Sequence, residues 1–136
     1  MYKISEIAEM VGGRLVGDPD VCVRRLLMDS RLLFFPEETM FVAIKSVRDD
    51  GHNYIEDLYH RNVRCFMVSQ ELLDFKQFAG ACFVVVKDTV SALQRLTAAH
   101  RSRFNVPVIG ITGSNGKTIV KEWLYQLLHE DYRITR

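Results

Sequence analysis

Residues 108–118 are Val108-Ile109-Gly110-Ile111-Thr112-Gly113-Ser114-Asn115-Gly116-Lys117-Thr118, which predicts a strand, a glycine-rich loop and a helix in that order. Glycine lets the loop backbone turn sharply, so several N–H groups can point inward, and the helix adds the positive end of its dipole. This arrangement predicts a cradle for phosphate oxygens. The lysine would reach the terminal phosphates of a nucleotide as the catalytic cation, and the last hydroxyl would complete the coordination of its magnesium ion. The predicted binding residues are Gly113, Ser114, Asn115, Gly116, Lys117 and Thr118.

The spacing of this loop departs from the usual phosphate-binding pattern by one residue. The pattern G-x-x-x-x-G-K-[ST] requires a glycine at Ile111, whereas the sequence has Gly110. The alternative is a glycine-rich corner between a strand and a helix, with an exposed lysine. The predicted strand before the loop, the predicted helix after it and Gly113 within it favour the phosphate site.

Strands and helices alternate along the chain, which is typical of an α/β protein with a largely parallel sheet. The run 82–86 has no polar interruption, so both of its faces should be covered. Asp88 or Thr89 is expected to cap the helix that follows, and Asn53 is expected to cap an earlier helix. The expected strands span 14–16, 21–28, 40–44, 65–68, 82–86, 108–111 and 132–135, and the expected helices span 5–11, 54–59, 70–78, 89–104 and 117–129.

These elements are predicted to form two domains with a boundary near Val86. Residues 1–86 would form a compact unit built on several short strands, and residues 87–136 would begin a second domain. A second domain with a single complete strand cannot bury a sheet. We therefore expect the 136 residues to stop within that domain.

Composition and charge argue against several classes of protein. The 18 Lys and Arg residues against 17 Asp and Glu give a net charge of +1, without the clustered basic face that nucleic acid requires. The four histidines lack metal-ligand spacing, and the apolar runs are too short to cross a membrane. The first residues lead directly into a helical pattern, so no signal peptide is expected. Three separated cysteines, two of them in apolar runs, predict reduced thiols in a cytoplasmic protein.

Several groups of residues resemble the Mur ligases, ATP-dependent enzymes that build the bacterial cell-wall precursor. Residues 112–118 resemble their ATP loop, which departs from the usual spacing in the same way. Asp29-Ser30-Arg31, Phe41-Val42-Ala43 and Asp50-Gly51-His52 resemble the uridine-nucleotide domain that two branches of the family share. The residues flanking the loop, including Val120-Lys121-Glu122, are most similar to the members that join D-alanyl-D-alanine to UDP-N-acetylmuramoyl-tripeptide.

The resemblance implies a small mixed-sheet uridine-nucleotide domain followed by the truncated start of a P-loop α/β ATPase domain, with ATP and Mg²⁺ as cofactors. Many family members have glycine where this chain has Ser46, so the resemblance does not determine the backbone path of that loop. The residues alone favour another interpretation of Asp29-Ser30-Arg31, as an ordinary strand-end turn. His52 would be a ligand contact or a helix-entry residue, and the second is favoured. The residues implied to contact the UDP part of the substrate are Ser30, Arg31, Ala43, Lys45 and Ser46.

By the same resemblance, the full enzyme would convert the tripeptide carboxylate into an acyl phosphate, which the amine of D-alanyl-D-alanine then attacks. The chain alone is expected to be inactive and to bind ATP weakly, because the remaining magnesium ligands, the adenine pocket and the dipeptide-binding domain would lie beyond Arg136. The alternatives are the branch that adds the third peptide residue, a non-catalytic uridine-nucleotide-binding module, and an unrelated P-loop NTPase. Residues 119–124 also resemble members that are fused to an alanine racemase.

Overall fold

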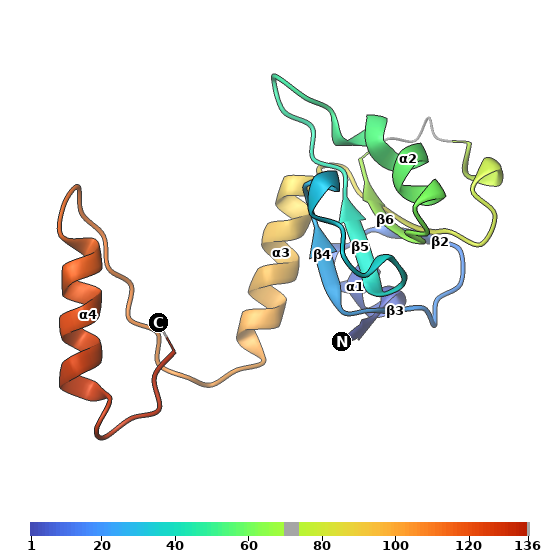
Figure 1. The fold of residues 1–136 in the computed structure, drawn as a ribbon. Coiled ribbons are helices and arrows are strands. Elements are labelled where there is room, and N and C mark those ends of the chain that lie inside the picture. Colours follow the sequence, from blue (N-terminus) through green and yellow to red (C-terminus); the bar gives the residue numbers. More distant parts are fainter. Residues whose placement is uncertain (70–73, 136) are drawn as a thin grey trace. The chain divides into compact units, whose positions relative to one another are not determined.

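The computed structural model describes residues 1–69 and 74–135 (Figure 1). The chain divides into two compact units, Met1–Phe104 and Asn105–Arg136.

The first unit is built on a mixed sheet. In the described part of the chain, five strands lie in the order β2 (Arg14–Val16), β7 (Cys82–Val85), β6 (Cys65–Val68), β5 (Thr39–Val42) and β4 (Arg25–Leu27). The pairs β4–β5, β5–β6 and β6–β7 are parallel, and β2 runs antiparallel to β7. The predicted α/β class with a largely parallel sheet is confirmed.

Helices cover both faces of this sheet (Figure 1). On one face, α1 (Ile4–Val11) and α3 (Thr89–Ser102) pack against Met40 and Val42 of β5. On the other face, α2 (Ile55–His60) packs against Phe41. Successive side chains of a strand point to opposite faces, so a strand covered on both sides must be apolar at every position. This explains the apolar runs of β6, β7 and residues 40–42 of β5, all of which are buried; the one polar residue of these strands, Thr39, donates its hydroxyl to the Phe35 carbonyl.

Residues at the helix ends stabilise the predicted helices. The Asp88 side chain accepts a hydrogen bond of 2.8 Å from the Ser91 N–H and caps α3, as predicted. Helix α1 ends at Gly12, which has the left-handed conformation with φ 64° that favours glycine. The Asn53 cap is wrong: Asp50 caps the short 3₁₀ helix η3 (Gly51–Tyr54), and α2 follows directly from it.

The expected strand over residues 21–28 is wrong in one respect, because it is two strands in two sheets. The first, β3 (Cys22–Val23), pairs antiparallel with β1 (Tyr2–Lys3), and the second, β4, pairs with β5. Between them, the Arg24 N–H donates to the Glu38 carbonyl at 2.9 Å. Arg24 and Arg25 stand at the break, but charged residues also occur within single strands, so the strand partners decide that two strands form.

Three further 3₁₀ helices form in connecting segments. They are η1 (Ser30–Leu32), η2 (Pro36–Glu38) and η4 (Phe75–Gln77). The expected helix over residues 70–78 falls partly on 70–73, which lie outside the described residues. Its described part is the single turn of η4, which Asp74 caps. Among the described residues, every helix is too short or too polar to cross a bilayer.

The second unit contains α4 (Lys117–Leu128), close to the predicted helix over 117–129. The expected strands over 108–111 and 132–135 do not form, since residues 105–135 contain no strand with which either could pair. A strand depends on hydrogen bonds to a neighbouring strand, whereas a helix bonds within itself. The first unit ends at Phe104 rather than near Val86, because α3 packs against α1. The assignment of residues 87–136 to the start of an ATP-binding domain stays a prediction.

Candidate nucleotide sites

The carboxyl ends of the four parallel strands meet at one edge of the sheet, which we call the carboxyl edge. Asp29 follows β4, Ala43 follows β5, Ser69 follows β6, and Thr89 lies a few residues beyond β7. Open α/β sheets bind ligands at this edge, because loops from several strands converge there. All five residues predicted to contact the UDP group lie in the loops after β4 and β5.

Asp29 organises the loop after β4. Its carboxylate accepts hydrogen bonds from Arg31 through Nε at 2.9 Å, through Nη2 at 2.6 Å and through the backbone N–H at 3.1 Å. These bonds lower the pKa of Asp29 to about 2, with the side-chain hydrogen bonds as the largest cause. The Ser30 carbonyl accepts a bond of 3.0 Å from Arg61. The local turn that the residues alone favoured is present, and its Asp29 carboxylate binds the exposed Arg31 guanidinium at the carboxyl edge.

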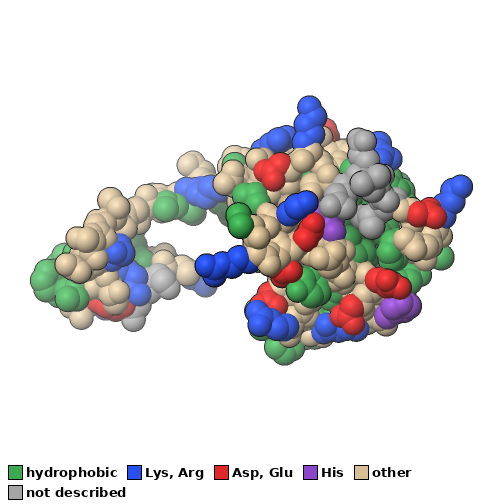
Figure 2. Space-filling model, turned by 90° about the horizontal axis from the view of Figure 1, so that it is seen from above, with side chains coloured by type: hydrophobic (Ala, Val, Ile, Leu, Met, Phe, Trp, Pro, Cys, Tyr) green, Lys and Arg blue, Asp and Glu red, His purple; other side chains and the backbone are tan. Residues whose placement is uncertain are grey.

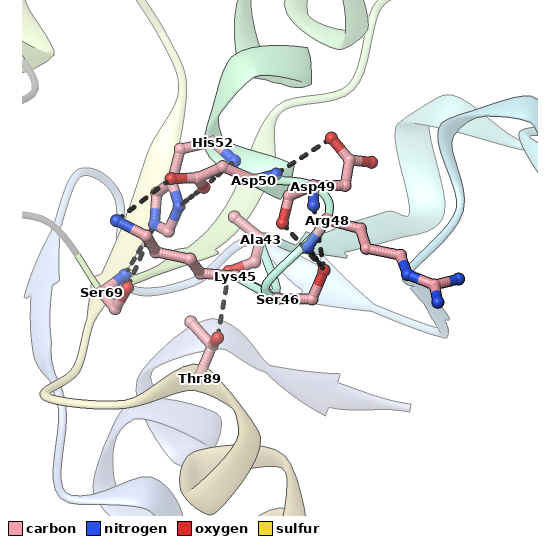
Figure 3. A network of polar contacts seen from close by, with 9 residues as sticks. All are labelled: Ala43, Lys45, Ser46, Arg48, Asp49, Asp50, His52, Ser69 and Thr89. Atoms are coloured by element: carbon pink, nitrogen blue, oxygen red, sulfur yellow. Dashed lines mark hydrogen bonds and ion pairs between the residues drawn. The ribbon is translucent and has the colours of Figure 1, made fainter.

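The loop after β5 is closed by its own hydrogen bonds (Figure 3). The Ser46 N–H donates to the Asp49 carbonyl at 2.8 Å, and the Ser46 hydroxyl accepts from the N–H groups of Asp49 at 3.0 Å and Arg48 at 3.3 Å. Lys45 pairs with Asp50, with 3.6 Å between Nζ and Oδ2. The Ser46 side chain therefore closes this turn.

Ala43 lies beneath this loop and is fully buried. Its N–H donates to the Met67 carbonyl at 2.9 Å, and its carbonyl accepts from the Thr89 hydroxyl at 3.0 Å. Both backbone groups are thus bonded within the protein, and the methyl group packs in the core. Ala43 is therefore part of the core next to the loop, while Lys45 and Ser46 are exposed.

His52 lies at the entry to the helical segment formed by η3 and α2, in keeping with the helix-entry role that the residues favoured. It lies within η3, is buried, and both ring nitrogens are bonded: Nδ1 to Asp50 Oδ1 at 2.5 Å and Nε2 to the Ser69 N–H at 3.0 Å (Figure 3). Hydrogen bonds from the N–H and then from the side chain of His52 lower the pKa of Asp50. The roles of Asp50, Ser69 and Thr89 in this site were not predicted from the sequence. An Asp directly before a Gly-His pair after a buried strand was the available signal for the first of them.

Tyr54 and Asp49 are bonded to each other within the segment that follows β5. The Tyr54 hydroxyl donates to the Asp49 carboxylate at 3.0 Å, and this bond raises the pKa of Tyr54. Asp29 raises the pKa of Arg31 first by hydrogen bonding, and Asp49 and Tyr54 raise it by charge interaction. The two predicted groups of UDP residues, in the loops after β4 and β5, lie at the same edge of the sheet.

A separate hollow of about 310 Å³ lies beside the edge strand β4, lined by Arg25, Leu26, Leu27, Leu32, Phe34, Phe35 and Thr39. None of the predicted site residues lines it. Figure 2 shows acidic and basic side chains interspersed over the visible surface of the first unit, in keeping with the absence of a clustered basic face in the sequence.

The glycine-rich loop of the second unit curls back at the start of α4. Gly116 precedes the helix with φ 76°, and Gly113 has φ 150°, both in the range that favours glycine. The first helical bond of α4 runs from the Val120 N–H to the Gly116 carbonyl at 2.9 Å. The N–H groups of residues 117–119 lie before that bond and so point out of the helix start. Lys117 Nζ donates to the Gly113 carbonyl, so its ammonium group lies over the loop.

The comparisons with known proteins agree with this geometry. The chain is 30% identical over 133 residues to the UDP-N-acetylmuramoyl-tripeptide–D-alanyl-D-alanine ligase of Bacillus subtilis, an alignment that covers 96% of this chain and 28% of that protein. The crystal structure of MurF from Acinetobacter baumannii matches with a TM-score of 0.82 and 28% identity, over 97% of this chain and 28% of that one. The chain belongs to the Mur ligase family. No protein-family model matches it.

Other Mur ligases are similarly close. The UDP-N-acetylmuramoyl-L-alanyl-D-glutamate–2,6-diaminopimelate ligase of Cytophaga hutchinsonii is 31% identical over 132 residues, covering 96% of this chain and 25% of that protein. The MurF ligase of Thermotoga maritima, in complex with ADP, has a TM-score of 0.65 and 28% identity over 82% of this chain and 25% of that one. The chain spans about a quarter of the length of these Mur ligases.

Proposed function

We propose that this chain is the N-terminal part of a MurF-type ligase, which joins D-alanyl-D-alanine to UDP-N-acetylmuramoyl-tripeptide in peptidoglycan synthesis. The first unit would bind the UDP group, and the glycine-rich loop would bind the phosphates of ATP. The names of the relatives support a ligase of this pathway. The whole reaction would also require the parts of the Mur ligases that this chain does not span.

The carboxyl edge supports the assignment of the UDP group. Ser30, Arg31, Lys45 and Ser46 place hydroxyl and cationic groups above a rigid base, and the two cations are held by Asp29 and Asp50. On binding, the oxygens of a pyrophosphate would replace these carboxylates as partners of the two cations, because phosphate oxygens accept the same paired N–H donors of a guanidinium group. Such an exchange requires no change in the sheet beneath.

The loop geometry supports the assignment of ATP. The N–H groups at the start of α4 and the Lys117 ammonium group are the donors that a triphosphate requires. Thr118 is exposed beside them and offers a hydroxyl oxygen, a ligand that Mg²⁺ accepts. Magnesium, when bound, would neutralise charge on the phosphate oxygens. The Thermotoga maritima MurF ligase is in complex with ADP, which supports an adenine nucleotide here.

The proposed reaction has two steps. A carboxylate oxygen of the tripeptide attacks the γ-phosphorus of ATP, ADP leaves, and an acyl phosphate forms. The amine of D-alanyl-D-alanine attacks the acyl carbon, inorganic phosphate leaves, and the amine proton passes to solvent. The first step brings two anions together, so Lys117 and the loop N–H groups would act by stabilising the phosphate oxygens as charge moves onto them.

The glycine-rich loop at the start of α4, with Lys117 folded over it, is the observation that carries the proposal. Saturation-transfer NMR of the 136-residue chain with ATP and with UDP, separately, tests it. We expect a weak ATP signal that Lys117→Ala abolishes and that the matched variant Lys121→Ala, on the same helix, leaves unchanged. We expect a UDP signal that Lys45→Ala weakens and Lys76→Ala does not. Absence of both signals would refute the proposal.

The chain alone is predicted to lack ligase activity. Release of phosphate from UDP-tripeptide, D-alanyl-D-alanine, ATP and magnesium above the level of the Lys117→Ala variant would contradict this. A UDP signal without an ATP signal would favour a non-catalytic uridine-nucleotide-binding module. A fusion to alanine racemase stays a prediction, as does a cytoplasmic location, which the free cysteines Cys22, Cys65 and Cys82 support.

A second candidate is the MurE type, which adds the third peptide residue. The Cytophaga hutchinsonii relative supports it, because its identity of 31% equals or exceeds that of the tripeptide ligases. Lys121 and Glu122 after the loop favour the MurF type. Expression of the complete coding sequence, followed by assays with diaminopimelate and with D-alanyl-D-alanine as the amine, separates the two.

A further inference from the structure

The buried ring of His52 is a bridge between two loops of the carboxyl edge. Its side chain is 4% exposed. One ring nitrogen faces a carboxylate and the other faces a backbone N–H, so the contacts define the tautomer. Nδ1 carries the proton and donates to Asp50, while Nε2 accepts from the Ser69 N–H.

The two partners of His52 lie in segments that follow different strands. Asp50 ends the loop after β5, and Ser69 is the first residue after β6. Strands β5 and β6 are paired through residues 40–42 and 65–67, and the loop after β5 extends beyond this pairing. The ring therefore holds the far end of that loop to the end of β6, where no strand pairing holds it.

At Gly51 the backbone of the loop comes back into contact with Ile44, close to the end of β5. Its N–H donates to the Ile44 carbonyl at 2.9 Å, next to the bridge between Lys45 and Asp50. A Cβ atom at Gly51 would lie 2.8 Å from Ile44 N, so only glycine fits this approach. The turn around Ser46 closes the other end of the loop. His52 is thus the link between a self-closed loop and the rest of the sheet.

We propose that His52 is a positioning residue, which fixes the loop over residues 45–50 in the conformation that binds the UDP group. This inference rests on the proposed UDP site. A loop that samples other conformations binds with an affinity reduced by the fraction of time spent in the competent one. The ring itself would not touch the ligand, because it is buried, whereas Lys45 and Ser46 are exposed.

Two substitutions separate the roles of the two ring nitrogens. In His52→Gln, the amide oxygen can take the position of Nε2 and accept from the Ser69 N–H. In His52→Asn, the shorter side chain can reach only Asp50, so the bridge to β6 is lost. The matched control is His60→Asn, which makes the same change at an exposed histidine of α2. Asp50→Asn serves as a further variant that weakens the same bridge at its other end.

UDP affinity is measured by NMR titration of the full 136-residue chain, and amide hydrogen exchange is measured without ligand. Loss of one hydrogen bond to a buried donor predicts about a tenfold weaker UDP affinity for His52→Asn. Exchange of the Ser46, Gly51 and Ser69 amides should be faster by about the same factor. His52→Gln and His60→Asn should stay within about threefold of the unsubstituted chain in both measurements.

Equal UDP affinity and equal amide exchange in His52→Asn and His60→Asn would overturn the inference. If the unsubstituted chain does not bind UDP, the proposed UDP site fails, and the exchange rates alone then decide whether His52 positions the loop. If His52→Asn does not fold, Asp50→Asn replaces it, with faster exchange at Ser69 and Gly51 as the expected result. Unchanged exchange in that variant would also overturn the inference.

Discussion

Replacing Thr89 by valine should destabilise the first unit through a single hydrogen bond. Thr89 is the first residue of α3 and is 2% exposed, and its hydroxyl donates to the carbonyl of Ala43, which is 0% exposed, at 3.0 Å. Valine has nearly the same shape but no donor, so the carbonyl oxygen loses a buried partner. Such a loss costs about 1–3 kcal/mol.

This loss of stability can be measured as a shift in the melting temperature. For a unit of about 100 residues, each kcal/mol moves the midpoint by about 4–8 °C. We therefore expect Thr89→Val to melt at least about 4 °C below the unsubstituted chain when followed by circular dichroism. The UDP affinity should fall in the same variant, because Ala43 lies only two residues before Lys45.

Thr97→Val is the matched control for this prediction. Thr97 lies on the same helix, is exposed, and donates only to carbonyls of its own helix, those of Leu93 and Gln94. An exposed substitution of this kind changes stability by no more than about 0.5 kcal/mol. If the two variants melt within about 2 °C of each other, the Thr89 hydroxyl does not stabilise the carboxyl edge and the reasoning fails.

Two other predictions concern the same edge of the sheet. Gly51→Ala should cost about 1–3 kcal/mol in urea unfolding, because its Cβ would approach the backbone of Ile44 and the chain must shift; a midpoint equal to that of the exposed neighbour Asn53→Ala would contradict this. Arg31→Lys should raise the pKa of Asp29, measured by NMR of its carboxyl carbon, from about 2 toward its ordinary value of 3.8, because lysine cannot make the paired side-chain bonds. Since the folded pKa is the lower one, the stabilisation by Asp29 is complete above about pH 4 and is lost as the pH falls toward 2; an unchanged pKa in the lysine variant would show that the backbone N–H alone sets it.

Local patterns in the sequence determined the elements of the first unit. The apolar runs of β5, β6 and β7 and the Asp88 cap of α3 each depend on neighbouring residues, and each was predicted close to its observed place. The glycines of the loop before α4 were predictable for the same reason, since a positive φ is a property of one residue. The start and end of α4 followed from the same local signals.

The tertiary structure alone decided which strands have partners and which side chains meet. The run over 21–28 contains two strands because β1 and β5 draw its halves into different sheets, and residues 108–111 form no strand because no partner lies in residues 105–135. The bridge from Asp50 through His52 to Ser69 joins the ends of two strands, so no local pattern could reveal it. Helices and turns are bonded to their own neighbours in sequence, whereas sheets and sites are bonded across long separations that only folding closes.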